Sequence, residues 1–270
     1  MQMEKSHMQS KDFGDWNASL YMRYARERTQ PSRDLAARVF CSAECPKILD
    51  VGCGSGNSSR VLKERFPRAD ILGIDSSADM IEAARRENPD IEFRKCAITP
   101  ECSEISGGYD VVFSNACLQW VPRHDVLFVS LFGKLARGGT LAVQIPLTEK
   151  MPITSVLEDL KSRPQWRGAF DGVRDLRALS AESYYDIVSQ LTDDFSIWRT
   201  DYFHTMDGVE AIIDWYSGAR LRPYFAALPE CRRAEFSDCV GENIEKYYPI
   251  RKNGKIAMPF TRLFILATKK

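Results

Sequence analysis

The sequence is poor in the features that mark metal proteins and membrane proteins. It has three histidines, and none of its eight cysteines forms a Cys-x-x-Cys pair, a spacing typical of zinc sites. No run of about 18 uncharged apolar residues is present, and residues 1–12 are polar, without the apolar core of a signal peptide. We therefore expect no metal, reduced cysteines, no membrane association and a cytoplasmic protein.

An excess of one charge sign is also missing. Lysine and arginine together number 37, as do aspartate and glutamate, and the pI is about 6.8. Such a chain has no net field that would attract nucleic acid or an anionic membrane. With 270 residues, 44% of them hydrophobic, it can bury a sizeable core. We expect a globular protein, a monomer or a simple homo-oligomer, that binds a small molecule and no nucleic acid.

A glycine-rich turn between two apolar runs is the most informative pattern present. Residues 48–51 are typical of a buried parallel strand, and three alternating glycines follow them: Gly52, Gly54 and Gly56. Because glycine adopts positive φ and carries no Cβ, a ligand can pack directly on the backbone of such a turn. A second apolar run, 71–74, ends at Asp75, roughly 20 residues after the first glycine, where an acid accepts hydrogen bonds from ribose hydroxyls. The pattern predicts a nucleoside-binding βαβ unit.

The residues around the turn narrow the choice of nucleoside. Asn57 stands where a dinucleotide-binding turn has glycine or alanine, and no lysine follows Gly56 as it would in a Walker loop. A nicotinamide-dependent oxidoreductase is disfavoured by Asn57 and by the lack of a plausible proton-donor pairing. A turn that serves only to reverse the chain is disfavoured by Asp75. The order Asp-x-Gly-x-Gly-x-Gly, from Asp50 to Gly56, resembles motif I of the S-adenosylmethionine-dependent methyltransferases.

Strand and helix patterns alternate over the first half of the chain. Strands are predicted at 48–51, 71–74, 91–93, 109–114 and 140–145, with helices at 34–40, 57–66, 76–84 and 127–135. Ser76-x-x-Asp79 is the predicted start of one helix, and Arg137-Gly-Gly139 the predicted stop of another. The alternation predicts an α/β fold with a parallel sheet and helices on both faces.

The pattern changes after Pro146, where helical segments predominate and strands are predicted at 197–203 and 259–268. We therefore expect three parts. These are an N-terminal cap segment (1–33), a cofactor-binding core (34–146), and a helical substrate cap that also supplies the last two strands (147–270).

Segments far from the glycine turn resemble a particular subfamily of these enzymes, the trans-aconitate 2-methyltransferases. The segments are Asp15–Tyr21, Asn115–Trp120, Leu141–Pro146, Ile197–Thr200, Leu221–Pro223 and Pro259–Phe264. The resemblance runs from about residue 15 to the C-terminus. It implies a class I, Rossmann-like methyltransferase fold with a seven-stranded, mostly parallel sheet whose last strand is antiparallel. It also implies transfer of a methyl group from S-adenosylmethionine to a carboxylate of trans-aconitate or a related small di- or tricarboxylic acid.

The resemblance assigns the cofactor contacts. The methionine end is lined by Asp50, Gly52, Gly54 and Gly56, the ribose is held by Asp75, the adenine is flanked by Ser76 and Met80, and the sulfonium region is faced by Asn115 and Ala116. Trp16 and Tyr21 are expected to cover the site, with a role as core anchors as the alternative. The family commonly places an acid against the adenine amino group after the third strand. Here Ala97 and Ile98 occupy that region, so we expect adenine to be held by backbone groups and apolar contact.

The chemistry predicted for the acceptor needs no catalytic base. A carboxylic acid with a pKa of about 4 is already ionised at pH 7, so positioning and exclusion of water carry the rate. Carboxylates that are not methylated need fixed partners, for which guanidinium groups are best suited. The predicted substrate contacts are Arg199, Arg222 and Arg262, followed by Arg28, Tyr202, His204 and Trp120. Alternatives are another acceptor, such as an acyl-thioester carboxylate or a heterocyclic nitrogen, and a cofactor-binding protein without activity.

Overall fold

The computed structural model describes residues 24–148, 151–173 and 178–270. The chain divides into two compact units, the larger comprising residues 26–148, 151, 178–203 and 259–270 of the described part. The smaller unit includes residues 152–173 and 204–258 of the described part. Trp16 and Tyr21, which were predicted to cover the cofactor, lie outside the described residues.

A seven-stranded sheet with the order β3-β2-β1-β4-β5-β7-β6 organises the larger unit. The strands are β1 (Lys47–Val51), β2 (Asp70–Asp75), β3 (Glu92–Lys95), β4 (Tyr109–Asn115), β5 (Leu135–Pro146), β6 (Phe195–Met206) and β7 (Ile256–Thr268). The first five pair in parallel, and β7 runs antiparallel to β5. The chain passes between the two units within β6 and again within β7. The predicted fold class is confirmed.

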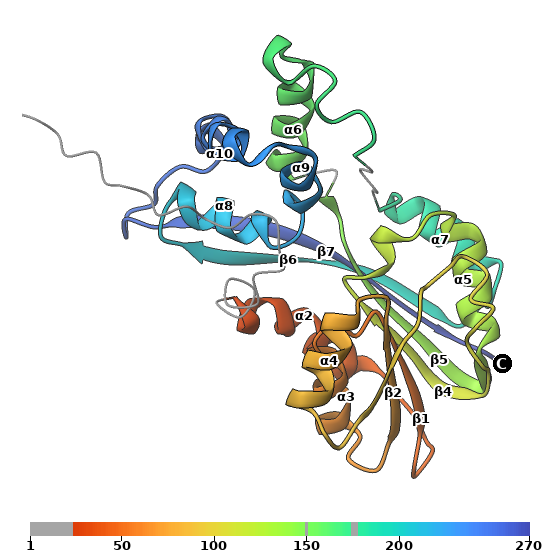
Figure 1. The fold of residues 1–270 in the computed structure, drawn as a ribbon. Coiled ribbons are helices and arrows are strands. Elements are labelled where there is room, and N and C mark those ends of the chain that lie inside the picture. The colour runs from red at the N-terminus through yellow and green to blue at the C-terminus, as the bar shows by residue number, and fades with distance from the viewer. Residues whose placement is uncertain (1–23, 149–150, 174–177) are drawn as a thin grey trace, which may run out of the picture. The chain divides into compact units, whose positions relative to one another are not determined.

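Helices cover both faces of this sheet (Figure 1). One face packs against α2 (Ala25–Arg38), α3 (Asn57–Arg65) and α4 (Ala78–Glu87), and the other against η1 (Leu118–Trp120), α5 (His124–Gly133) and α7 (Ala181–Ser189). Because side chains alternate along a strand, successive residues enter different cores. Thus Val112 and Val143 pack on the α5 side, whereas Phe113, Ala142 and Phe264 pack on the α2 side.

Several predicted helix boundaries are wrong. The helix predicted at 34–40 is α2, which begins at Ala25 and ends at Arg38. The N-cap of α4 is Ser77 rather than Ser76, and its side chain accepts the hydrogen bond from the Met80 N–H at 3.3 Å. The helix predicted to stop at residues 137–139 ends instead at Gly133, and those residues lie within β5. The pairing between β4 and β5 is irregular there, and Gly138 has a φ of +79°. Gly138 and Gly139 therefore accompany an irregular strand pairing and do not end a helix.

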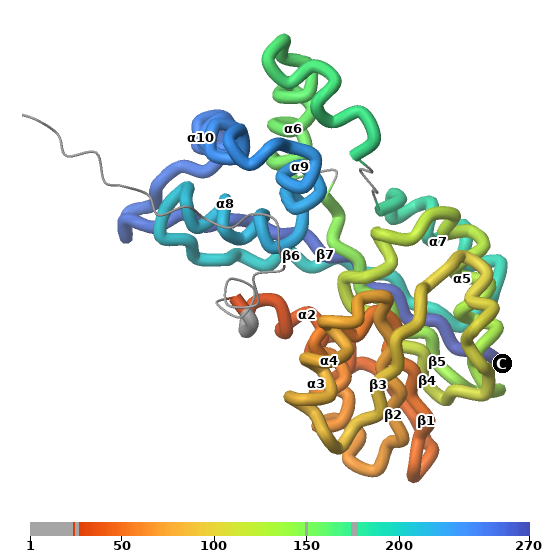
Figure 2. The backbone as a smooth tube through the Cα atoms, viewed as in Figure 1, coloured from red at the N-terminus to blue at the C-terminus, as the bar shows by residue number. Residues whose placement is uncertain are grey.

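The smaller unit is helical outside β6 and β7. Its helices are α6 (Pro152–Ser162), η3 (Pro164–Trp166), α8 (Val209–Ser217), α9 (Arg222–Ala227), α10 (Glu230–Ile244) and η4 (Glu245–Tyr247), whose path Figure 2 traces. Trp166 lies at the centre of its core, with its ring centroid 5.2 Å from that of Phe236 and 6.0 Å from that of Phe170. The helical segments predicted after Pro146 thus include helices that bury an aromatic cluster.

Candidate active site

The glycine turn joins β1 to α3 at the carboxyl end of the sheet. The N–H groups of Gly52 and Cys53 donate to the Ile74 carbonyl at 2.8 and 3.0 Å, so the turn is fastened to β2. All three alternating glycines have positive φ: Gly52 (+74°), Gly54 (+54°) and Gly56 (+87°). A Cβ on Gly52 would lie 2.1 Å from the Cys117 Sγ, whereas a Cβ on Gly54 would have no atom within 4 Å. The turn is therefore packed against protein at Gly52 and open at Gly54.

Asp75 connects the end of β2 to two neighbouring segments. Its Oδ2 accepts a hydrogen bond from the Gly54 N–H at 3.1 Å, and its Oδ1 accepts one from the Ser77 N–H at 2.9 Å. A carboxylate has about four acceptor positions, so each oxygen can take a further hydrogen bond. The side chain is only partly buried. This geometry fits a carboxylate that also accepts from ribose hydroxyls.

Asp50 is fully buried beneath the turn. Its Oδ2 accepts hydrogen bonds from the hydroxyls of Ser58 and Ser59, both at 2.6 Å, while its Oδ1 has no partner among the described residues. Burial raises the pKa of Asp50 to about 6, with a further contribution from Asp75, although the two serine hydrogen bonds oppose the shift. A cationic donor on a bound ligand would satisfy the remaining oxygen and favour the ionised carboxylate.

The end of β4 makes a sharp turn beside the glycines. Ala116 has a φ of +53°, which costs a residue with a Cβ roughly 1–2 kcal/mol. Its N–H donates to the Gln144 carbonyl at 3.0 Å, and its carbonyl accepts from the Gln119 Nε2 at 2.7 Å. The Oδ1 of the preceding Asn115 is buried without a partner among the described residues. A residue at positive φ and a buried oxygen that no described residue hydrogen-bonds therefore occur together at the end of β4.

The residues predicted to contact adenine follow the ends of β2 and β3, and one of them, Met80, lies in the first turn of α4. The Cys96 N–H donates to the Asp75 carbonyl at 2.9 Å, which brings the two strand ends together. Ser76 and Ala97 are exposed there, and Met80 and Ile98 are half-buried. The Ala97 side chain has no hydrogen-bonding group. An adenine in this region would meet backbone groups and the apolar side chains of Met80 and Ile98.

Three predicted substrate residues belong to the larger unit and to its α2-side face. The Arg262 side chain is 5% exposed, and its guanidinium lies 4.3 Å from the centre of the Phe260 ring. Tyr202 donates its hydroxyl proton to the Asp34 Oδ2, and burial together with this hydrogen bond raises its pKa. Arg28 is half-buried on α2, one turn before the fully buried Ser32. These residues place cationic and hydroxyl groups on the same face as Asp50.

The other predicted substrate residues are exposed or belong to the smaller unit. Arg199 is exposed, and strand alternation puts it on the face of β6 opposite Tyr202. Arg222 is exposed at the start of α9, and His204 is buried with its ring 4.5 Å from that of Trp215, both within the smaller unit. Trp120 ends η1 with 40% of its surface exposed. Their contacts with a substrate stay predictions.

The sequence patterns missed Gln144. This residue lies within β5, is fully buried, and has neither its Oε1 nor its Nε2 hydrogen-bonded among the described residues. The available signal was an amide inside the apolar run 141–145. Such a residue suits a buried strand poorly unless its amide has a partner.

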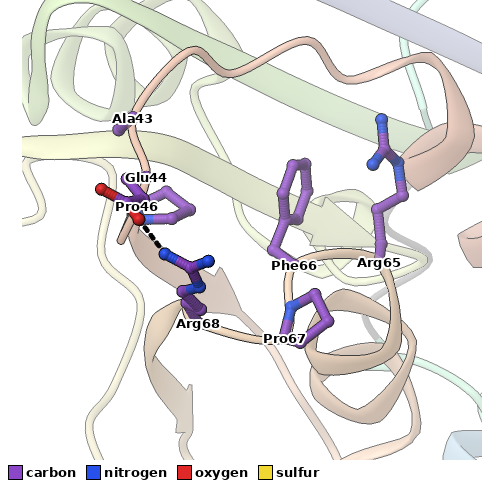
Figure 3. Close-up of a pocket in the computed structure, with 7 residues that line it drawn as sticks. All are labelled: Ala43, Glu44, Pro46, Arg65, Phe66, Pro67 and Arg68. Carbon is purple, nitrogen blue, oxygen red and sulfur yellow. Dashed lines mark hydrogen bonds and ion pairs between the residues drawn. The ribbon is translucent and has the colours of Figure 1, made fainter.

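A shallow pocket elsewhere in the larger unit is not part of this site. It is lined by Ala43, Glu44, Pro46 and residues 65–68, at the amino ends of β1 and β2 (Figure 3). Glu44 and Arg68 form an exposed ion pair across it. The glycine turn and Asp75 lie at the opposite ends of the same two strands, where open α/β sheets bind their ligands.

Within residues 24–148, 151–173 and 178–270, no group of three or more His, Cys, Asp or Glu side chains is placed to hold a metal ion. Over the same ranges, no helix has the length and apolar character needed to span a bilayer. All eight cysteines are free thiols.

Comparison with known proteins agrees with the architecture. A methyltransferase-domain family model matches residues 48–139. A putative methyltransferase from Bacillus halodurans has a TM-score of 0.55 at 13% identity, covering 90% of this chain and 99% of that chain. Geranyl diphosphate methyltransferase in complex with SAM has a TM-score of 0.55 at 15% identity, covering 96% and 94%. The fold and the turn define a class I, S-adenosylmethionine-dependent methyltransferase.

Relatives in sequence match almost the whole chain. The trans-aconitate 2-methyltransferase of Paracidovorax citrulli is 37% identical over 257 residues, which are 94% of this chain and 98% of the relative. The enzyme of the same name from Rhizobium meliloti is 39% identical over 260 residues, with coverage of 94% and 98%. The chain belongs to the trans-aconitate 2-methyltransferase family.

Proposed function

We propose that this protein transfers a methyl group from S-adenosylmethionine to a carboxylate of trans-aconitate or a related small di- or tricarboxylic acid. The observation that carries the proposal is the identity of 37–39% with trans-aconitate 2-methyltransferases over 94% of the chain. This match extends far beyond residues 48–139, which the general methyltransferase domain covers. It therefore includes the segments that would determine the acceptor.

The residues of the turn suit the two ends of the cofactor. Asp75 has acceptor positions left for ribose hydroxyls, and the open side of Gly54 leaves room for a ligand against the backbone. The Asp50 Oδ1, which has no partner within the described part of the chain, suits the ammonium of the methionine part. When bound, the cofactor supplies a methyl group on a positively charged sulfur. Asn115 and Ala116 are the proposed neighbours of that region.

The adenine end is held without a carboxylate. Ala97 replaces the acid expected in the family, so the exocyclic amine would be met by backbone groups near Ile98. Loss of one hydrogen bond of this kind costs about 0.5–1.5 kcal/mol, which weakens binding without abolishing it.

The acceptor requires no proton transfer. Its carboxylate is ionised at pH 7, so the protein's work is to hold it, align it and exclude water. Arg262 supplies a nearly buried guanidinium on the same sheet face as Asp50, and Arg28 and Tyr202 supply further donors. A buried guanidinium binds a carboxylate with two parallel hydrogen bonds. We propose these residues as the partners of the carboxylates that are not methylated, with Trp120, Arg199, Arg222 and His204 as further candidates.

A direct assay tests the proposal. Purified protein is incubated with methyl-labelled S-adenosylmethionine and a panel of small mono-, di- and tricarboxylic acids, and labelled esters are separated by chromatography. We expect ester formation with trans-aconitate or a closely related acid. If no acid accepts label while a metabolite extract yields a labelled product, the acceptor belongs to another class. If calorimetry detects no binding of S-adenosylhomocysteine, the protein is not a cofactor-dependent enzyme at all.

A further inference from the structure

The buried amide of Gln144 indicates a polar group beside it. Its side chain offers two N–H donors and one carbonyl acceptor, and neither polar atom has a hydrogen-bond partner among the described residues. Buried polar groups in proteins are almost always hydrogen-bonded. The residues on either side, Val143 and Ile145, are fully buried and apolar. An apolar residue at position 144 would fill the strand without leaving an amide unpaired, so the amide points to a ligand.

The position of Gln144 in the sheet places it between two groups of site residues. It pairs with Asn115 of β4 on one side and with Phe264 of β7 on the other. Alternation puts all three side chains on the α2-side face, where Phe264 packs. Asn115 also carries a buried oxygen without a partner among the described residues. The residues proposed to contact the cofactor lie on this β4 side of Gln144.

Arg262 lies on the other side of Gln144. It pairs with Pro146, so on β7 it is two residues from the partner of Gln144 and shares its face. Such diagonal neighbours are about 7–8 Å apart at the Cα atoms, within reach of two long side chains. A guanidinium and an amide N–H can therefore donate to the same bound group. Because both groups donate hydrogen bonds, they suit an anionic group of the ligand. They do not suit an ammonium group, for which the Asp50 carboxylate is the proposed partner.

We infer that Gln144 is a substrate-positioning residue whose Nε2 donates to an oxygen of the carboxylate that Arg262 holds and that is not methylated. The inference rests on the proposed function, since it takes a carboxylic acid as the ligand. The amide fixes the rotation of that carboxylate, and with it the direction of the acid toward Asn115 and the cofactor. A site that hydrogen-bonds a substrate group discriminates strongly against analogues that lack the group. Gln144 thus selects acids that carry a carboxylate at this position.

The test compares two variants on the same strand and face. Gln144→Leu removes the amide with little change in volume, and Thr140→Val makes a similar polar-to-apolar change at a buried residue four positions away, at the other end of the sheet. Calorimetry measures binding of S-adenosylhomocysteine to each protein, then binding of trans-aconitate to that complex. Steady-state kinetics measures KM and kcat for trans-aconitate and for a dicarboxylate analogue that lacks one carboxylate.

We expect Gln144→Leu to weaken trans-aconitate binding and raise its KM at least tenfold, and to lose most of the preference over the analogue. Binding of S-adenosylhomocysteine should stay within twofold, and Thr140→Val should behave as wild type. Equal acid binding in wild type and Gln144→Leu would overturn this inference alone. Weaker S-adenosylhomocysteine binding with unchanged acid binding would assign the amide to the cofactor and also overturn it. If the wild type binds no acid, the proposed acceptor class and this inference are both overturned. Acid binding without product would contradict the proposed reaction alone, and the binding data would still decide the role of Gln144.

Discussion

The Asp75 carboxylate holds the glycine turn in place, because its Oδ2 accepts a hydrogen bond from the Gly54 N–H at 3.1 Å. Its Oδ1 accepts from the N–H of Ser77, the residue that caps α4. One side chain therefore fixes both the turn and the start of the next helix. Its proposed contact with ribose uses the acceptor positions that remain, so ligand binding and local structure depend on the same group.

Replacing Asp75 should weaken cofactor binding strongly. We expect Asp75→Ala to raise the dissociation constant of S-adenosylhomocysteine at least tenfold, about 1.4 kcal/mol, because the ribose contact and the anchor of the turn are both lost. Titration calorimetry measures this directly. Asp79→Ala, at an exposed position in the first turn of α4, is the matched control and should bind as wild type. A wild-type dissociation constant in Asp75→Ala would place the ribose contact elsewhere.

Three glycine-to-alanine changes should distinguish the effect of backbone strain on stability from the effect of lost ligand space on cofactor binding. Gly54→Ala and Gly138→Ala both put a Cβ into open space at positive φ, so each should lose about 1–2 kcal/mol of unfolding free energy. Only Gly54→Ala should also weaken S-adenosylhomocysteine binding. Gly52→Ala adds a clash with Cys117 and should lose about 3 kcal/mol. Urea denaturation and calorimetry check these values, and equal cofactor binding by the variants at positions 54 and 138 would contradict the proposed site.

Loss of the Asp50 proton should lower the free energy of unfolding as the pH rises. Its folded pKa of about 6 exceeds the ordinary value of 3.8, so the folded state binds more protons than the unfolded state between these pH values. The free energy of unfolding therefore decreases through this window, by about 3 kcal/mol in all. Urea denaturation between pH 4 and 7 should show this decrease in wild type relative to Asp50→Asn. Parallel curves for the two proteins would contradict it.

The same carboxyl should make cofactor binding dependent on pH. If Asp50 pairs with the ammonium of the ligand, binding favours its ionised form, so the affinity for S-adenosylhomocysteine should fall as the pH drops from 7 to 5. Asp50→Asn should lose this dependence. Calorimetry at several pH values measures it, and an affinity independent of pH in wild type would exclude the ammonium contact.

The hydrogen bond from Tyr202 to Asp34 links β6 to α2. Tyr202→Phe should lower the unfolding free energy by about 0.5–1.5 kcal/mol, because one hydrogen bond of a half-buried pair is removed. Tyr185→Phe, which changes a 55% exposed tyrosine in the same unit, is the control and should change it by less than about 0.5 kcal/mol. An increase in the KM of the acid in Tyr202→Phe alone would support the predicted substrate contact. An unchanged free energy of unfolding would show that the hydrogen bond makes no net contribution to stability.

The glycine turn and Asp75 were predictable because their signal is local. Positive φ at Gly52 and an acid at the end of an apolar run are properties of short segments, and a parallel sheet brings neighbouring strand ends together without further information. The seven-stranded fold followed from the same alternation and from the family resemblance.

Gln144 and the ranking of the arginines could not be predicted in this way. The importance of Gln144 depends on its register with Asn115 and Phe264, which come from distant parts of the chain. Arg199 and Arg262 looked equivalent as arginines in strands, yet one is exposed and the other is nearly buried. A shift of one position decides which face a strand residue occupies, and only the packed sheet fixes it.

The proposed esterification of a carboxylate is tested most sharply by the chemical nature of the product. Trans-aconitate is incubated with the protein and S-adenosylmethionine labelled in the methyl group, and the product is analysed by mass spectrometry before and after mild alkaline hydrolysis. We predict a monomethyl product whose label is released as methanol by base, with formation strongly reduced in Arg262→Met. A labelled product that survives the base, or no product from any carboxylic acid with the cofactor bound, would contradict it.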